Sequence, residues 1–408
     1  MVQPELVAPA GTLEKAEAAF AFGADAVYLG GTEFSLRAAA GNLDAHDLGE
    51  AVALAHGLGK RVYVTVNALA HTRDLQRLPA FLESLAALRV DSIIVADLGV
   101  MALARRYAPE VPITVSTQAS VTNAEAARVY RELGARRVVL AREATLEDIA
   151  DIAAGAGVEV EVFVHGAMCI AYSGRCLLSS AMTGRSGNRG ECAHPCRYRY
   201  ALVEEQRPGE YYPLEEDGRG SYLLNSRDLC LLDRLEALSN AGVRALKIEG
   251  RMKSLHYVAT VTRVYRQALD ALAAGQTTSR RNEWWEELHK VATRPFTEGF
   301  LWGTPAQGQD LRKEEKRLPV AFAGIVRDYD GERGLALVEQ RGNFGVGDLL
   351  ELLPPGEAAL TRLRLRELYD MDLRPLPRAR HAQQLVWAPL PGPLPPFTLV
   401  RRVVEAHG

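Results

Sequence analysis

The feature that most constrains this chain is an alternation of short apolar runs with helical patterns over roughly its first 250 residues. Runs rich in Val, Ile and Leu that are joined by helices predict a parallel sheet covered on both faces. Eight such units fit a (β/α)8 barrel, although a doubly wound open sheet has the same pattern. The eight runs begin near residues 6, 23, 61, 91, 112, 135, 159 and 244.

The seventh run is followed by an insertion that carries most of the cysteines. Four of the five cysteines of the chain lie there with the spacing C-x6-C-x15-C-x3-C, at Cys169, Cys176, Cys192 and Cys196. Spacing alone leaves an iron–sulfur cluster, a zinc site and unliganded or catalytic thiols open. Loops that follow barrel strands form the catalytic face. We therefore expect the segment 165–200 to lie over the barrel mouth.

Polar residues at the ends of the predicted strands are candidates for the site. Asn67, Gln118 and Arg142 each follow an apolar run, which fits a position at the mouth. In the eighth run, alternation places Lys247, Glu249 and Arg251 on one side of the strand. Charged groups that point into a barrel are costly unless they are paired or used, so they indicate either substrate binding and catalysis or an internal ion-pair lattice.

Two single residues near the insertion leave more than one interpretation. His165 ends the seventh run, where it could donate a proton, bind substrate or only orient a neighbour. Cys230 occupies an apolar position of a predicted helix in SRDLCLLDRL. Free cysteine is commonly buried, so we leave Cys230 out of the cysteine cluster, with replacement of one of the four ligands by Cys230 as the alternative.

The insertion is rich in arginine although the whole chain has a net charge of −3. From 173 to 200 there are five arginines and one acid. Such a segment would attract a phosphate backbone or a dicarboxylate, and it could equally be a solvent-exposed loop. The candidates for substrate contact are Arg175, Arg185 and Arg189.

Composition excludes several classes of protein. The N-terminal stretch MVQPELVAPAG has no basic n-region and no apolar h-region, and no apolar run reaches the roughly 20 residues of a membrane span. We therefore expect a cytoplasmic protein without a membrane partner, in which cysteines stay reduced. No pattern indicates an obligate protein partner.

The C-terminal part changes character after a charged stretch. We expect a catalytic domain over 1–305, a linker over 306–317 and a β domain over 318–408, where apolar and polar residues alternate between turns. A basic strip runs from Arg362 to Arg380 and fits either RNA contact or a charged edge strand.

Several motifs together resemble a known family. HGAMCIAYSGRCLLSS, GRSGNRGECAHPC and LKIEGRMKSLHYVATVTRVYRQ are similar to the U32 or collagenase-like peptidase family. The similarity extends from ELVAPAG onward and is strongest to the branch of prephenate-dependent tRNA uridine hydroxylases. It also covers the C-terminal part, which resembles the small β-barrel domain of that branch.

The resemblance implies specific chemistry. It implies a [4Fe-4S] cluster on Cys169, Cys176, Cys192 and Cys196, with prephenate as co-substrate. Because prephenate carries two carboxylates, Arg251 and Arg142 would bind them. His165, Glu249 and Arg251 are the catalytic candidates, and the arginines of the insertion together with the β domain would hold the anticodon arm of tRNA. Ribosomal RNA hydroxylation, a thiol or metal peptidase, and a zinc-stabilised RNA-binding factor stay open as alternatives.

Overall fold

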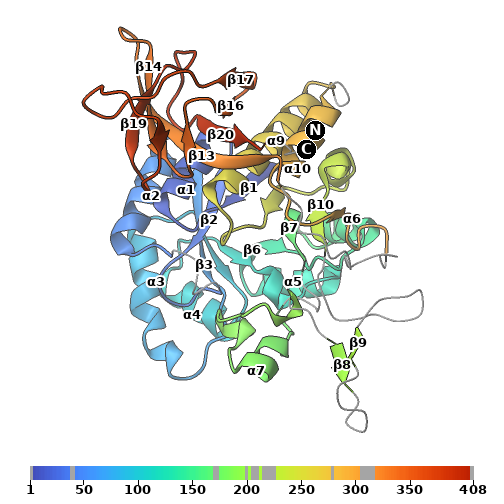
Figure 1. The fold of residues 1–408 in the computed structure, drawn as a ribbon. Helices are drawn as coiled ribbons and strands as arrows, with labels where there is room; N and C mark the ends of the chain where they lie inside the picture. The colour runs from blue at the N-terminus through green and yellow to red at the C-terminus, as the bar shows by residue number, and fades with distance from the viewer. Residues whose placement is uncertain are drawn as a thin grey trace.

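A computed structural model of the chain describes residues 3–36, 42–168, 174–197, 201–203, 211–213, 227–276, 280–303 and 318–404. Its larger part is a closed parallel barrel (Figure 1). Closure follows from the pairing of β11 with both β1 and β7, so the open-sheet alternative is excluded. The barrel strands are β1 (Glu5–Pro9), β2 (Ala26–Gly30), β3 (Arg61–Val66), β4 (Ser92–Val95), β5 (Ile113–Val115), β6 (Ala135–Val139), β7 (Glu159–Ala167) and β11 (Ala245–Ile248).

Helices cover the outside of the barrel, and short polar side chains set where several of them begin. Thr12, Asp44, Asn123 and Thr145 each accept a backbone N–H of the first helical turn, which is the N-cap interaction favoured for these residue types. The helices are α1 (Leu13–Ala21), α2 (Ala45–Gly57), α3 (Leu78–Ala87), α4 (Leu98–Tyr107), α5 (Ala124–Glu132), α6 (Leu146–Gly155), α8 (Leu235–Asn240), α9 (Leu255–Ala273) and α10 (Arg281–His289).

The insertion leaves the barrel after β7, as expected. It contains α7 (Leu178–Thr183), β8 (Ala201–Val203) and β9 (Tyr211–Pro213), which project from one end of the barrel (Figure 1). The chain returns through β10 (Asp228–Cys230), which pairs antiparallel with the end of β7, and β12 (Phe296–Thr297) extends the sheet from β10. The helix predicted around Cys230 is therefore wrong at this residue, because pairing with β7 makes it the end of a strand.

The C-terminal part is an antiparallel half-barrel. Its six-stranded sheet has the order β17-β16-β20-β13-β14-β19. The basic strip predicted from Arg362 to Arg380 starts on its edge strand β17, where Arg362 pairs with buried Glu351, and Arg378 pairs with Asp348. The strands are β13 (Val320–Asp330), β14 (Leu335–Gln340), β16 (Leu349–Leu353), β17 (Thr361–Arg364), β19 (Leu385–Ala388) and β20 (Leu399–Val403), with β15 (Phe344–Gly345) and β18 (Arg378–Ala379) in a separate small sheet.

An ionic network and an apolar layer join the half-barrel to the barrel. The Lys290 Nζ of the barrel part donates to Glu351 Oε1 at 2.8 Å, and Arg401 Nη1 donates to Glu287 Oε2 at 2.7 Å and to Glu351 Oε1 at 3.0 Å. All four side chains are buried. The apolar layer is formed by Ala18, Phe22, Leu255, Ala259, Ile325, Leu353 and Leu399.

The half-barrel lies away from the described elements of the insertion. Figure 1 shows it beside α1 and α9, at the opposite end of the molecule from α7, β8 and β9. Among the described residues, no helix combines the length and apolar character required to cross a membrane.

Candidate active site

A cavity of about 130 Å³ lies where the barrel strands end, beneath the insertion. This is the face on which barrel enzymes carry their active sites. The cavity brings together residues that are far apart in sequence and that the strand pattern had placed at the mouth. The predicted site residues that line it are Asn67, Gln118, Arg142, Cys176, Cys192, Cys196, Lys247, Glu249 and Arg251.

Three cysteines of the insertion face this cavity. Cys176, Cys192 and Cys196 are half-buried and line its wall. The segment folds back on itself around them, because Ser179 Oγ accepts the backbone N–H of Ala193 at 3.0 Å. Cys169, the fourth predicted ligand, lies outside the described residues. Three thiols that line one cavity from irregular backbone are a donor set that suits an iron–sulfur cluster.

A buried guanidinium forms one wall of the cavity. Arg251 is 3% exposed, and its Nη1 donates to Ser35 Oγ at 2.7 Å and to Thr65 Oγ1 at 3.0 Å. Its Nη2 donates to Asn42 Oδ1 at 2.6 Å. These bonds to neutral oxygens fix the orientation of the guanidinium. A guanidinium held at the wall of a cavity is a group that binds carboxylates and phosphates.

The end of β2 makes room for this guanidinium. A Cβ on Gly30 would lie 2.3 Å from Arg251 Nη2 and 2.5 Å from Ser35 Oγ. Gly30→Ala is thus expected to overpack the site and to lower the free energy of unfolding by about 1–3 kcal/mol. Urea denaturation of both proteins measures the change. Gly57→Ala is the matched control, because no atom lies within 4 Å of the added Cβ, and an equal loss in that control would contradict the explanation.

Lys247 reaches the cavity from the barrel interior. Its Nζ donates to Glu161 Oε1 at 2.6 Å and lies 4.3 Å from the centre of the Tyr28 ring. Burial alone would raise the pKa of Glu161, but the charges of Lys247 and Arg137 outweigh it and lower that pKa. Arg137 continues the pairing to Glu5. Lys247 therefore belongs to an ion-pair lattice and also lines the cavity, and substrate binding by Lys247 stays a prediction.

Arg142 and Phe163 also line the cavity. The guanidinium carbon of Arg142 lies 3.9 Å from the centre of the Phe163 ring, at a cation–π distance. Aromatic and hydroxyl side chains complete the lining of the cavity. They include Tyr28, Thr65, Ser116, Phe163 and His194. The sequence did not identify them as site residues, because strand periodicity does not distinguish them from residues of the core.

His165 lies behind the cavity wall and not in it. Its ring packs against the rings of Tyr257, Tyr265 and Phe296, and its Nδ1 lies 3.3 Å from Tyr265 Oη. Burial lowers the pKa of His165 to about 3, with Lys253 adding a smaller effect. A neutral imidazole in this position does not suit proton donation to a substrate. The geometry instead supports the orienting role that the sequence had left open.

Cys230 packs in the same buried layer. Its Sγ lies 3.7 Å from Tyr265 Oη, and burial raises the pKa of its thiol to about 12. Such a thiol is a poor nucleophile. Cys230 is not among the residues that line the cavity, and its exclusion from the cluster stays a prediction.

The arginines of the insertion have different surroundings. Arg175 and Arg185 are exposed, and Arg175 Nε lies 3.4 Å from Ser120 Oγ. Arg189 Nη1 instead donates to Asp74 Oδ2 at 3.0 Å. Arg189 therefore makes an internal contact, whereas Arg175 and Arg185 are available to a ligand of the outer surface.

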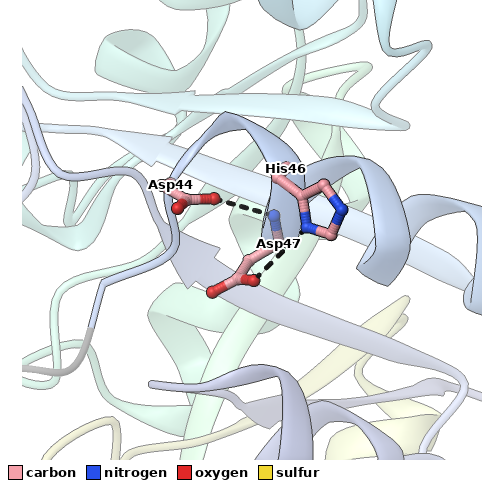
Figure 2. A group of neighbouring side chains, drawn as sticks. All are labelled: Asp44, His46 and Asp47. Carbon is pink, nitrogen blue, oxygen red and sulfur yellow. Dashed lines mark hydrogen bonds and ion pairs between the residues drawn. The ribbon is translucent and has the colours of Figure 1, made fainter.

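Another group of potential metal ligands has a simpler explanation. Asp44, His46 and Asp47 gather at the start of α2 (Figure 2). Asp44 caps the helix by accepting the backbone N–H of Asp47 at 2.9 Å. His46 is exposed. Helix capping accounts for this group, and we assign it no further role.

Fold and site together define a class: a barrel protein with a cation-lined, thiol-lined cavity at the carboxyl ends of its strands. The chain belongs to peptidase family U32. The family's sequence model matches residues 11–310, and the model of its C-terminal domain matches residues 320–401.

Several proteins that are similar to this chain are named for the modification of RNA. The chain is 39% identical to tRNA hydroxylation protein P1 of Bacillus subtilis over 402 residues, which cover 98% of this chain and 95% of that protein. It is 36% identical to tRNA hydroxylation protein P of Escherichia coli over 435 residues, which cover 96% of this chain and 94% of that protein. It is 39% identical to the E. coli 23S rRNA 5-hydroxycytidine C2501 synthase over 268 residues, which cover 66% of this chain and 39% of that protein.

Proposed function

We propose that this chain hydroxylates C5 of the wobble uridine of tRNA, using prephenate and a [4Fe-4S] cluster. The observation that carries the proposal is one cavity with cysteine thiols on its roof and the cations Arg251, Arg142 and Lys247 on its walls. Near-complete coverage of relatives named for tRNA hydroxylation supports the tRNA substrate over ribosomal RNA. The named rRNA enzyme is covered over only 39% of its length.

Cys176, Cys192 and Cys196 fit the proposed cofactor, with Cys169 as the fourth ligand. Thiolates are the usual ligands of iron–sulfur clusters, and loops can supply them with irregular spacing. When bound, the cluster would supply redox or Lewis-acid chemistry above the cavity. The half-buried position of the three described thiols would limit the access of water to it.

The cations of the cavity would bind the co-substrate. Prephenate has two carboxylates, which Arg251 and Arg142 of the cavity lining would bind. Phe163 and Tyr28 also line the cavity and would contact its ring. Glu249 also lines the cavity and is the carboxylate that could hold or move a proton there. We assign His165 no proton transfer, because it is buried behind this wall.

RNA would approach over the insertion. Arg175 and Arg185 are exposed there, beside Leu177, which is 70% exposed. Cations contact phosphates, and an exposed apolar side chain can support an unpaired base, as enzymes that modify bases in loops require. The half-barrel lies at the other end of the molecule (Figure 1). It would contact a distant part of the tRNA and not the modified nucleotide.

Nucleoside mass spectrometry tests the proposed substrate. The gene is expressed in a bacterial strain that lacks its own tRNA hydroxylation genes, and digests of tRNA and of 23S rRNA are analysed separately. We expect 5-hydroxyuridine derivatives to return in tRNA only. Hydroxycytidine in rRNA with unmodified tRNA would favour the rRNA enzyme, and no change in either RNA would overturn the proposal.

Iron and sulfide content tests the cofactor independently of activity. Protein purified without oxygen is expected to be brown and to hold about four irons and four sulfides per chain. Cys192→Ala and Cys196→Ala should each remove most of this iron, because a cubane needs its ligands, whereas Cys230→Ala should keep it. A colourless protein with one zinc would instead establish a structural metal site.

A peptidase remains the alternative from another class, because the family carries that name. A thiol peptidase would need a histidine beside the reactive cysteine. His165 precedes Cys169 by four residues, but its ring packs on Tyr265 and burial lowers its pKa to about 3, which does not favour it as that histidine.

A further inference from the structure

The cysteine-bearing segment is attached to the barrel mouth at a few specific points. One lies in the loop between β3 and α3, residues 67–77. Leu69 N donates to Asn188 O at 3.1 Å, and Arg189 Nη1 donates to Leu69 O at 3.3 Å and to Asp74 Oδ2 at 3.0 Å. A backbone hydrogen bond and two side-chain hydrogen bonds thus join residues 188–189 to residues 69–74.

The Asp74 carboxylate, which accepts the hydrogen bond from Arg189, is oriented by hydrogen bonds within its own loop. Asp74 Oδ2 also accepts the backbone N–H of His71 at 2.8 Å, and Asp74 N donates to His71 O at 2.8 Å. The carboxylate is therefore held in place before Arg189 binds to it. The side chains of Asp74 and Arg189 are 14% and 25% exposed, so the pair is partly shielded from solvent. Hydrogen bonding by Arg189, with the His71 backbone second, lowers the pKa of Asp74.

The contact is connected directly to the thiols. Asn188 Nδ2 donates to Cys176 O at 3.4 Å. Gly187, just before it, lies against Cys192, whose Sγ is 3.7 Å from where a Cβ on Gly187 would be. A second attachment lies at the start of the segment, where Gly174 packs so closely on Gln118 O that a Cβ would lie 2.1 Å from it.

We propose that the loop 67–77 is a latch that holds the cysteine segment over the cavity, with Asp74 as the positioning residue that acts through Arg189. The latch gives Arg189 a role other than the RNA contact expected from its sequence. Breaking it would let the roof lift, so that the thiols become accessible and the cavity opens to water. The importance of this roof for catalysis rests on the proposed function, but the latch itself does not.

Thiol alkylation of metal-free protein tests the latch without substrate or activity. Protein is purified without oxygen, freed of metal by a chelator and treated with iodoacetamide, and labelling of each cysteine is followed by peptide mass spectrometry. The rate is measured as a function of pH up to its plateau. The plateau reports access to the thiolate, whereas a change in thiol pKa only shifts the midpoint.

Asp74→Ala and Arg189→Ala are each expected to raise the plateau rates at Cys176 and Cys192 by about three- to fivefold, the scale of a partly exposed ion pair. The double variant Asp74→Arg, Arg189→Asp should return them toward the wild-type rate. Glu83→Gln, an exposed carboxylate on α3, is the matched control for charge and should change nothing. Asp74→Asn should give a smaller increase.

Cys230 reports on folding in every sample, because it is buried and should stay unlabelled. If an alanine variant exposes Cys230, Asp74→Asn and the charge-exchanged pair decide the result. Wild-type plateau rates in both alanine variants would overturn the latch, as would a failure of the exchanged pair to restore them. Loss of tRNA hydroxylation with unchanged labelling would concern the proposed function alone.

Discussion

Replacing Arg251 with alanine is expected to lower kcat/KM for tRNA hydroxylation by about 100- to 1000-fold, which corresponds to about 3–4 kcal/mol of transition-state binding. The Arg251 side chain is buried and lines the cavity. Its removal would eliminate the cation proposed to bind a carboxylate. It would also leave Ser35, Thr65 and Asn42 without their shared donor.

Two further variants separate binding from folding. Arg251→Lys keeps the charge but has no planar fork, so it should recover only part of the activity, mainly as a raised KM for the anionic substrate. Met252→Ala changes the next residue, which is 47% exposed, and should leave kcat/KM within about twofold. Circular dichroism and thermal melting are recorded for each protein. Near-normal kcat/KM for a folded Arg251→Ala protein would contradict the role given to this residue.

Glu351→Gln is expected to lower the free energy of unfolding by about 3 kcal/mol. Removing one acid from a buried network leaves its cations uncompensated, which typically costs about 3–5 kcal/mol. Here Lys290 and Arg401 would keep only Glu287 between them, so the lower end of that range applies. Chemical denaturation measures the change. Glu357→Gln, an exposed carboxylate of the same domain, should stay within about 0.5 kcal/mol of wild type.

The same network predicts a dependence on pH. Burial alone would raise the pKa of Glu351, but hydrogen bonding and charge from Lys290, with Arg401 and Arg362, lower it to about 2. A depressed carboxyl pKa gives stability that is present above the unfolded value, about 4.3, and is lost as the pH falls through the folded value. The stability difference between wild type and Glu351→Gln should therefore shrink from about pH 4.5 to about pH 2. A constant difference over this range would contradict the assignment.

The architecture could be predicted from local patterns because they agree with the tertiary structure. The runs around Val27, Val64 and Val138 became barrel strands, and glycine-ended helices joined them. The alternation of Lys247, Glu249 and Arg251 placed all three on the cavity wall, even though regular strand structure ends at Ile248. The alternation of side chains along a strand depends only on residues that are close in sequence, so it can be predicted from the sequence alone.

The parts that sequence reasoning missed depend on contacts between distant residues. His165 is withdrawn from the mouth by rings 92 and 100 residues further along, at Tyr257 and Tyr265. Arg189 finds its partner 115 residues earlier, at Asp74. Cys230 is part of strand β10 because this segment pairs antiparallel with the end of β7. Neither charge counts nor periodicity report such pairings.

The most direct test is hydroxylation by the purified protein. Unmodified tRNA from a deletion strain is incubated without oxygen with cluster-containing protein, with and without prephenate, and digests are examined for 5-hydroxyuridine by mass spectrometry. We expect the modified nucleoside only with prephenate, and its loss with Cys192→Ala and Arg251→Ala. Protein that holds four irons yet leaves tRNA unmodified, or an Arg251→Ala protein that modifies tRNA equally well, would contradict the proposed function.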